Sequence, residues 1–303
     1  MFLHLVALIP LIVSRYFVVS APSEKSGATL FPKELMKNIH STAVIHPAAE
    51  IADDVTVGPY VVIEEDVAIG RGTTIDSHAC IKRFTTIGEG NRLHCGVVLG
   101  DLPQSLSFKG APSYLRIGAG NTFREHVTIH RSMVEGGATV IGDYNYFMAL
   151  SHAGHDCVIG NRTIITSCAL IAGHTVVEDN VIISGAVVIH QFTRIGRLAM
   201  LSGLSAVNRD IPPFVIAGGR PASASGLNVI GLRRAGVTQA ALTRLKEAFK
   251  IFYTSGLNAS RALEEIEKGE MTPEVRQFTE FIRASKRGVC RYAEWAEERG
   301  ADF

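Results

Sequence analysis

Residues 57–75 read VGPYVVIEEDVAIGRGTTI, and this stretch decides the fold. Ile63, Ile69 and Ile75 recur at a constant hexad spacing, each followed by a glycine or an acidic residue and preceded, two positions earlier, by a β-branched residue. The same spacing places aliphatic residues at Ile45, Ile51, Val57, Ile63, Ile69, Ile75, Ile81, Ile87, Leu93 and Leu99. Hexapeptide repeats are typical of parallel β-helices. Three hexads close a triangular coil of about 18 residues, so residues one coil apart stack at a strand spacing of roughly 4.8 Å.

The repeat breaks twice and resumes each time, which predicts two excursion loops at about residues 101–114 and 132–138. Loops that leave the wall of a repeat protein often carry its function. After the second break, stacking of successive coils predicts three columns that are aliphatic throughout: Ile159, Val177 and Ile195; Ile165, Ile183 and Leu201; Ile171, Ile189 and Val207.

The chain divides into three parts in this interpretation. The β-helix is expected over residues 37–217, with its repeats ending near Asp210-Ile211-Pro212-Pro213 because proline cannot donate to a strand ladder. Residues 218–303 are expected to form a Gly/Ala/Ser-rich connector and a small C-terminal α-helical domain. Apolar residues at helical spacing mark helices over 242–252, 263–266 and 275–282, and a fourth is suggested over 292–298.

Residues 1–36 form a leader of uncertain status and are set aside from the fold argument. Residues 2–19 are largely apolar and are followed by small residues, as in a signal sequence or a membrane anchor. Against this, no Lys or Arg precedes the run and Arg15 interrupts it, so a mis-assigned start or a disordered leader fits as well. The expected location is therefore cytoplasmic, with membrane association only if the segment is retained.

Charge and cysteine content narrow the partners. Lys plus Arg number 30 and Asp plus Glu 29, so no basic field exists to attract nucleic acid. The five cysteines form no C-x-x-C pair, which suits reduced thiols in the cytosol and buried, structural positions.

The stretch His152-Ala153-Gly154-His155-Asp156 carries the candidate chemistry. Stacking of successive coils puts His155 over Gly173 and Gln191, while Asp156 stacks over His174 and Phe192. A histidine can take a proton from an attacking hydroxyl, and a glycine lets a carbonyl oxygen approach its backbone N–H. Asp156 is placed to orient a histidine. Because no nucleophilic serine or reactive cysteine motif accompanies this stretch, we expect direct attack by the acceptor without an acyl-enzyme.

Other interpretations of the histidines remain open. His152 and His155, with His174 or His190, could bind zinc as in the γ-class carbonic anhydrases. That class does not explain the C-terminal helical segment or the arginines at 220 and 234. His126 and His130 are expected to be structural, and a non-catalytic solenoid scaffold is a further alternative.

Several motifs, in order along roughly residues 39–287, resemble one family. The motifs are Phe123–Arg131, His152–Cys157, Leu170–His174, Ile189–Phe192, Asp210–Pro213 and Gly226–Arg234. They resemble the acyl-carrier-protein-dependent UDP-N-acetylglucosamine O-acyltransferases, which catalyse the first step of lipid A synthesis. The resemblance implies a left-handed parallel β-helix of hexapeptide repeats, a homotrimer with its active site between subunits, and acyl carrier protein and UDP-N-acetylglucosamine as partners. No cofactor or metal is implied.

The resemblance also assigns roles to residues of this chain. His155 would be the general base for the sugar 3-hydroxyl, supported by Asp156, and the Gly173 N–H would hold the oxyanion. Contacts to the sugar, the acyl chain, the donor or the diphosphate would come from His152, His174, Gln191, Gly203, Asn228 and Arg234. At Gly203 a small residue would leave room for a longer acyl chain.

The chain departs from the family pattern around the recognition residues. Ser105 and Ser107 stand where the family commonly has Asp and Lys, with Lys109 as a replacement cation. Ile230 replaces a frequent Glu, and Ala235 follows where a second Arg is common. A serine keeps a hydrogen bond but loses the charge, so Ser105 is kept as a substrate contact of altered character. An alternative function is therefore a related nucleotide-sugar O- or N-acyltransferase with another sugar or donor.

Overall fold

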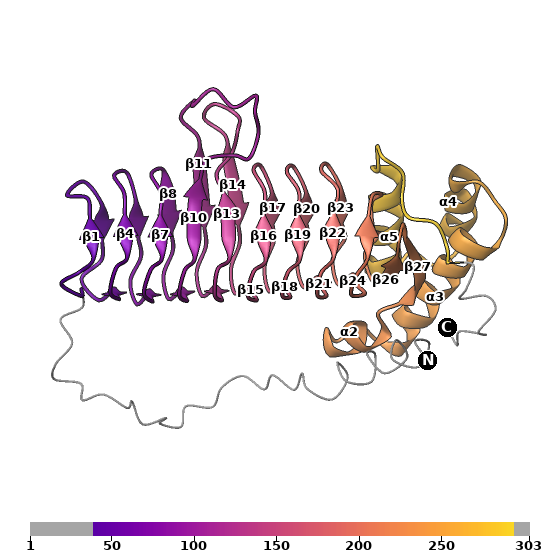
Figure 1. Ribbon diagram of the computed structural model, residues 1–303. Coiled ribbons are helices and arrows are strands. Elements are labelled where there is room, and N and C mark those ends of the chain that lie inside the picture. The colour runs from indigo at the N-terminus through magenta and orange to yellow at the C-terminus, as the bar shows by residue number, and fades with distance from the viewer. Residues whose placement is uncertain (1–38, 294–303) are drawn as a thin grey trace, which may run out of the picture. The chain divides into compact units, whose positions relative to one another are not determined.

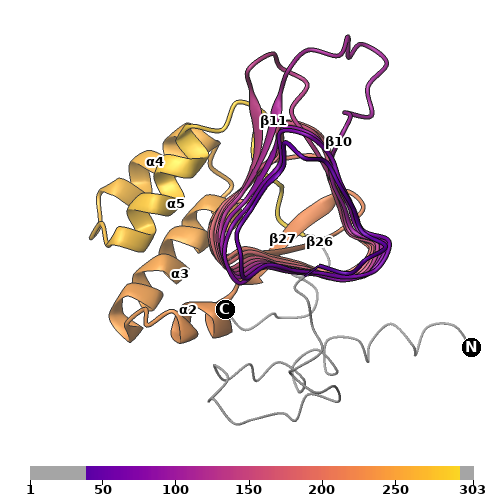
Figure 2. The same cartoon turned by 90° about the vertical axis from the view of Figure 1, so that its left-hand side faces the viewer.

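The computed structural model describes residues 39–293, which form a parallel β-helix followed by a group of α-helices (Figure 1). Seen from the N-terminal end, the chain passes from β10 (Val98–Asp101) to β11 (Tyr114–Ile117) anticlockwise as it recedes from the viewer (Figure 2). The β-helix is therefore left-handed, and the predicted fold class is confirmed. The leader over residues 1–36 and most of the segment 292–298 lie outside the described residues.

Each coil contributes one strand to each of three faces, here numbered in the order in which the chain meets them. The first face holds β1 (Val44–Ile45), β4 (Val62–Ile63), β7 (Cys80–Ile81), β10, β13 (Thr128–His130), β16 (His152–Ala153), β19 (Leu170–Ile171), β22 (Val188–Ile189) and β25 (Ala206–Val207). The second face holds β2 (Glu50–Ile51), β5 (Ala68–Ile69), β8 (Thr85–Ile87), β11, β14 (Ala138–Ile141), β17 (Val158–Ile159), β20 (Val176–Val177) and β23 (Arg194–Ile195).

The third face holds β3 (Thr56–Val57), β6 (Thr74–Ile75), β9 (Arg92–Leu93), β12 (Thr122–Phe123), β15 (Tyr146–Phe147), β18 (Ile164–Ile165), β21 (Ile182–Ile183), β24 (Met200–Leu201), β26 (Val215–Gly219) and β27 (Ala222–Leu227). We call the corner between the first and second faces the first corner, that between the second and third the second corner, and that between the third and first the third corner.

The register follows the predicted stacking. Residues one coil apart pair in the early and late coils, and all three predicted aliphatic columns are confirmed. The interval between paired residues is longer in the middle of the chain, where Val98 pairs with Thr128 and Thr128 with His152, because loops leave the wall after β10 and after β13. Both loops project from the first corner (Figure 2).

From Tyr144 to Leu204, one corner residue in every hexad adopts left-handed backbone angles. The positions are Tyr144, Leu150, Asp156, Arg162, Cys168, His174, Asn180, Ala186, Phe192, Leu198 and Leu204, with φ between 53° and 63°. Such angles cost a non-glycine residue about 1–3 kcal/mol each and persist only where the surroundings enforce them. Here the strands on either side enforce them, since their inward aliphatic side chains form one continuous core.

The end of the β-helix is more elaborate than predicted. Beyond Pro213, β26 pairs in parallel with β24 and turns back as β27, so the third face continues past the predicted end of the repeats and across the 217/218 boundary. The expected connector is thus largely a β-hairpin. Its backbone N–H and C=O groups form hydrogen bonds with the exposed edge of the third face, and the small residues at 222–226 allow this pairing. Residues 288–293 also bridge to Asp210 and Ala224, and Tyr292 forms a β-bridge instead of a helix.

In the described chain up to residue 293, four helices follow the hairpin: α2 (Val229–Arg234), α3 (Gln239–Thr254), α4 (Ala259–Glu267) and α5 (Pro273–Arg283). The last three confirm the predicted amphipathic segments, whereas the short α2 was not expected. Each helix begins after a capping residue whose side chain accepts a hydrogen bond from the backbone N–H three residues later. The capping residues are Asn228, Thr238, Asn258 and Thr272 respectively. Among residues 39–293, no helix is both long and apolar enough to cross a membrane.

Stability should depend on the aromatic pair in the third face. Phe123 and Phe147 stack at 5.1 Å between ring centroids and are fully buried. Phe123→Ala should lower the free energy of unfolding by about 3–5 kcal/mol, because it removes this pair and leaves a cavity. Urea unfolding would measure it, with Leu106→Ala in the exposed first loop as the control. A loss below about 1 kcal/mol would contradict the assignment.

Candidate active site

His155 and Asp156 lie in the turn that crosses the first corner between β16 and β17. Ala153 and Cys157 point into the core and are fully buried, so both ends of this turn are anchored. The left-handed φ of 60° at Asp156 then turns its side chain back toward the neighbouring imidazole. The His155 Nδ1 atom lies 2.8 Å from Asp156 Oδ2, in the geometry of a hydrogen bond.

The next two coils build the wall beside this pair. His174 occupies the same corner position one coil later, and its Nε2 lies 3.6 Å from Asp156 Oδ2. Its ring meets the His155 ring edge-on, with centroids 5.1 Å apart, and stacks flat on Phe192 at 4.5 Å. The column of Asp156, His174 and Phe192 predicted from the repeat is therefore present, and Phe192 fixes the plane of the second imidazole.

Two groups that the repeat pattern did not single out hold Asp156. Ser132 donates its hydroxyl to Asp156 Oδ1, and the Met133 N–H donates to Oδ2 at 3.2 Å. Burial tends to raise the pKa of this carboxyl, but the hydrogen bonds from Ser132, His155 and the Met133 N–H outweigh burial and hold the pKa below its ordinary value. Asp156 is therefore ionised at neutral pH. Ser132 and Met133 begin the second excursion loop. The break in the hexapeptide repeat at this loop was the sequence signal that could have pointed to them.

Gly173 lies directly against the His155 ring. A Cβ atom built on Gly173 would stand 2.6 Å from Cε1 and 2.7 Å from Nε2 of His155, so any side chain would displace the imidazole. Among the backbone hydrogen bonds between described residues, none uses the Gly173 N–H. A reacting group beside His155 Nε2 would thus have a free backbone donor within the same small space.

The nearby thiol is not a candidate nucleophile. Cys157 is fully buried, its Sγ donates to the Ala172 carbonyl at 3.2 Å, and burial raises its pKa to about 12. A thiolate is the reactive form, so this cysteine is inert at neutral pH. The expectation of buried cysteines holds for Cys157 and Cys290, whereas Cys80 and Cys95 are half-buried and Cys168 is exposed at the third corner.

His152 lies on the first face, just before the hydrogen-bonded pair of His155 and Asp156, which we call the dyad. Its Nδ1 is 2.8 Å from Thr128 Oγ1, and its ring meets that of buried His130 edge-on at 5.0 Å. Burial, followed by repulsion from His130, lowers the pKa of His152 to about 4. This imidazole is therefore neutral near neutral pH, with one ring nitrogen as a hydrogen-bond donor and the other as an acceptor.

The remaining predicted binding residues do not all gather at the first corner. Gln191 is exposed there, one coil beyond Gly173, and Ser105 lies in the first loop with its hydroxyl 2.9 Å from that of Ser107. Gly203, in contrast, is exposed at the third corner, between β24 and β25. Their roles as substrate contacts stay predictions.

Asn228 and Arg234 lie at yet another part of the molecule. Asn228 is buried, accepts the Gly231 N–H at 2.9 Å as the cap of α2, and donates to the Leu198 carbonyl at 2.9 Å. Since Leu198 lies between β23 and β24, this places the start of α2 at the second corner. Arg234 is exposed at the end of α2.

The zinc alternative required three imidazoles in one place. In residues 39–293, the group with metal-ligand spacing is His155, Asp156 and His174, which offers two imidazoles and a carboxylate. His152 is instead held by Thr128, and His190 contacts the Gln191 carbonyl and Arg287. The three-histidine arrangement of a carbonic anhydrase is not formed.

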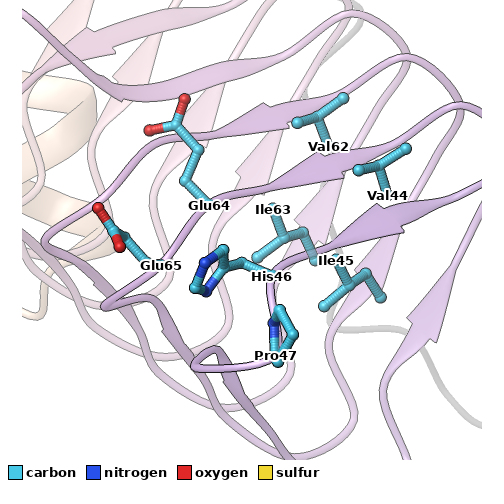
Figure 3. Close-up of a pocket in the computed structure, with 8 residues that line it drawn as sticks. All are labelled: Val44, Ile45, His46, Pro47, Val62, Ile63, Glu64 and Glu65. Carbon is cyan, nitrogen blue, oxygen red and sulfur yellow. The ribbon is translucent and has the colours of Figure 1, made fainter.

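Two surface hollows differ in their relation to this site. The one in Figure 3, about 470 Å³, lies in the first two coils, where Val44 and Val62 stand side by side near Glu64 and Glu65. It contains no predicted site residue, and its Glu64 is paired with Lys82 at 2.8 Å. The other, about 650 Å³, runs from His174 and Phe192 to Lys286 and Arg287, and so opens beside the dyad.

A left-handed β-helix with a half-buried His–Asp pair against a glycine fits the class of hexapeptide-repeat acyltransferases. Comparison with known proteins agrees: residues 138–173 match the model for bacterial transferase hexapeptide repeats, and residues 210–290 match that for domain 2 of UDP-N-acetylglucosamine O-acyltransferase. The chain is 48% identical over 262 residues to the acyl-(acyl-carrier-protein)–UDP-N-acetylglucosamine O-acyltransferase of Burkholderia lata, covering 84% of this chain and all of that one. It belongs to the UDP-N-acetylglucosamine O-acyltransferase family.

Other relatives give the same result. A protein of that name from Synechocystis is 45% identical over 199 residues, covering 66% of this chain and 72% of its own length. The crystal structure of LpxA, a UDP-N-acetylglucosamine acyltransferase from Bacteroides fragilis, superposes with a TM-score of 0.82 at 41% identity, over 84% of this chain and all of that one. LpxA from Acinetobacter baumannii gives 0.82 at 38% identity, with the same coverage.

The neutral state of His152 should make stability depend on pH. The unfolded chain protonates this histidine below about pH 6.5, whereas the folded protein resists protonation until about pH 4. The contribution is thus complete above pH 6.5 and is lost as the pH falls toward 4, by up to about 3 kcal/mol. Urea midpoints measured over this range at fixed protein concentration should fall less steeply for His152→Gln. Equal slopes would contradict the buried, neutral assignment.

Proposed function

We propose that this protein transfers a hydroxyacyl group from acyl carrier protein to the 3-hydroxyl of UDP-N-acetylglucosamine. The observation that carries the proposal is the contact of the His155 Nε2 edge with the Gly173 backbone, beside a carboxylate that binds Nδ1. Similarity over 84% of this chain to an acyl-(acyl-carrier-protein)–UDP-N-acetylglucosamine O-acyltransferase supports the donor and the acceptor.

The reaction follows from this geometry. Because Nδ1–H donates to Asp156, the Nε2 lone pair of His155 is free to accept the proton of the 3-hydroxyl. The oxygen attacks the thioester carbonyl carbon, and the negative charge on the carbonyl oxygen is stabilised by the Gly173 N–H. The ionised Asp156 stabilises the imidazolium that forms. When the C–S bond breaks, the imidazolium returns its proton to the leaving thiolate of the carrier protein.

The departures around the recognition loop bear on the sugar and the donor. The Ser105 and Ser107 hydroxyls bond to each other, and Lys109 is exposed in the same loop. The loop is tied to the wall through the Arg131 guanidinium, which lies over the Phe108 ring at 5.8 Å. The loop thus still offers hydroxyl groups that can bind a sugar and one cation, Lys109, that can bind a phosphate. We therefore retain UDP-N-acetylglucosamine as the proposed acceptor.

The dyad is tested by replacing its base. His155→Ala should lower kcat by at least about 10²-fold, the usual contribution of a general base. Ser132→Ala should cost less, because Asp156 keeps the Met133 N–H and His155 as partners. Acylation of UDP-N-acetylglucosamine by an acyl carrier protein thioester would be followed with purified protein, with His126→Gln as the control. Near-normal turnover of His155→Ala would overturn the mechanism.

A homotrimer is part of the proposal, for a geometric reason. On one chain the dyad lies at the first corner, Gly203 at the third, and the Asn228 cap of α2 at the second. Corners of one triangular coil face away from one another, so a single chain cannot offer all of these residues to one substrate. A neighbouring subunit can bring its third corner beside the first corner of this one, and three subunits close such a ring.

The surface supports assembly through the first face. At one aligned outward position, all nine strands carry an uncharged residue: Val44, Val62, Cys80, Val98, Thr128, His152, Leu170, Val188 and Ala206. Asp101, at the end of β10, is a charged residue outside this row. Leu170 and Val188 are 46% and 44% exposed, and the adjoining third corner exposes Leu150 and Leu204. Exposed apolar side chains grouped on one face in this way are typical of a protein interface.

Light scattering should therefore give three times the 32.7 kDa chain mass. Leu170→Glu should shift the protein toward the monomer and lower turnover in parallel, since a charge would be buried in the interface. Thr74→Glu, outward on the third face, should leave the mass unchanged. A monodisperse wild-type monomer would contradict the intersubunit site.

A further inference from the structure

We propose that His155, Asp156 and His174 also form a binding site for a divalent transition-metal ion of the Zn²⁺ class, and that occupation of this site stops the acyl transfer. The binding site stands on the geometry of the three side chains. Its effect on turnover rests on the proposed role of His155 as the base.

The three ligand atoms are already close to the required arrangement. His155 Nδ1, Asp156 Oδ2 and His174 Nε2 all lie within 4.8 Å of one another. The carboxylate oxygen is 2.8 Å from the first nitrogen and 3.6 Å from the second. Zinc bonds of roughly 2.0–2.1 Å in a tetrahedron put ligand atoms about 3.3 Å apart. The two carboxylate distances are within about half an ångström of this value, and the distance between the two nitrogens would shorten by at most about 1.5 Å.

The surroundings orient these ligands as the outer residues of a metal site do. Ser132 and the Met133 N–H hold Asp156, while the stacked Phe192 ring fixes the plane of His174. The side chains of His155, Asp156 and His174 are 16%, 10% and 28% exposed, so an ion can enter from solvent and keep a water molecule as its fourth ligand. Two imidazoles and one carboxylate select borderline transition metals over Mg²⁺ or Ca²⁺.

Metal binding would prevent His155 from acting as a base, because it moves the ring proton from Nδ1 to Nε2. In the metal-free dyad the His155 proton sits on Nδ1, facing Asp156, and Nε2 carries the free lone pair. A metal on Nδ1 needs the lone pair of that nitrogen, so the proton moves to Nε2 and none is lost. The imidazole then presents an N–H to the acceptor hydroxyl and cannot take its proton.

The binding site is tested without reference to activity. Chelator-treated full-length protein would be titrated with Zn²⁺ by isothermal titration calorimetry, with Mg²⁺ as the comparison ion. We expect one Zn²⁺ per chain, no heat from Mg²⁺, and at least a ten-fold weaker affinity in His174→Gln. His126→Gln, which alters an exposed histidine outside the cluster, should keep the wild-type affinity. Zn²⁺ should also raise the Tm of wild type more than that of folded His174→Gln at the same Zn²⁺ concentration. Unchanged binding by His174→Gln would overturn the site.

The effect on turnover is a separate measurement. Saturating Zn²⁺ should lower kcat by about 10²-fold, to the level of a missing general base, and excess chelator should restore it. Stoichiometric binding with unchanged turnover would overturn the proton shift while leaving the site. If the metal-free protein does not acylate UDP-N-acetylglucosamine, the proposed function fails, and the calorimetric result still decides the site.

Discussion

Parallel hydrogen bonding between successive coils is the constraint on which the rest of this structure depends. It holds inward aliphatic side chains such as Ile165, Ile183 and Leu201 in one column and enforces a left-handed residue at successive corners from Tyr144 to Leu204. The pairings across the two loops, Val98 with Thr128 and Thr128 with His152, still span whole numbers of hexads, so the phase of the repeat is the same before and after them. The loops can therefore vary without disturbing the wall.

The same constraint builds the reactive centre. A rigid ladder repeats one corner position in every coil, so Asp156, His174 and Phe192 meet although each lies a full coil of chain from the next. Rigid positioning of this kind suits catalysis, since little reorganisation is needed when charge develops. The dyad itself is made by adjacent residues, and the next coil contributes the glycine that leaves space for the ring.

The wall also sets the limit of what one chain can do. Its three faces keep the dyad, Gly203 and the cap of α2 at three separate corners. The first face, with exposed Leu170 and Val188, joins the first corner to the third. Assembly of subunits through that face is the simplest way for a three-faced β-helix to complete a substrate site. Oligomerisation is therefore part of the proposed mechanism.

The sequence by itself determined the coil, the columns and the stacking of His155 on Gly173, because a hexad repeat of fixed rise leaves one register. It also indicated both loops and three of the helices. It did not predict the β26–β27 hairpin or α2, since small residues such as those at 222–226 pair only where a sheet edge is available. Nor did it reveal that Ser132 and the Met133 N–H hold Asp156. Those contacts are made through a loop that leaves the repeat, and only tertiary structure decides where such a loop returns.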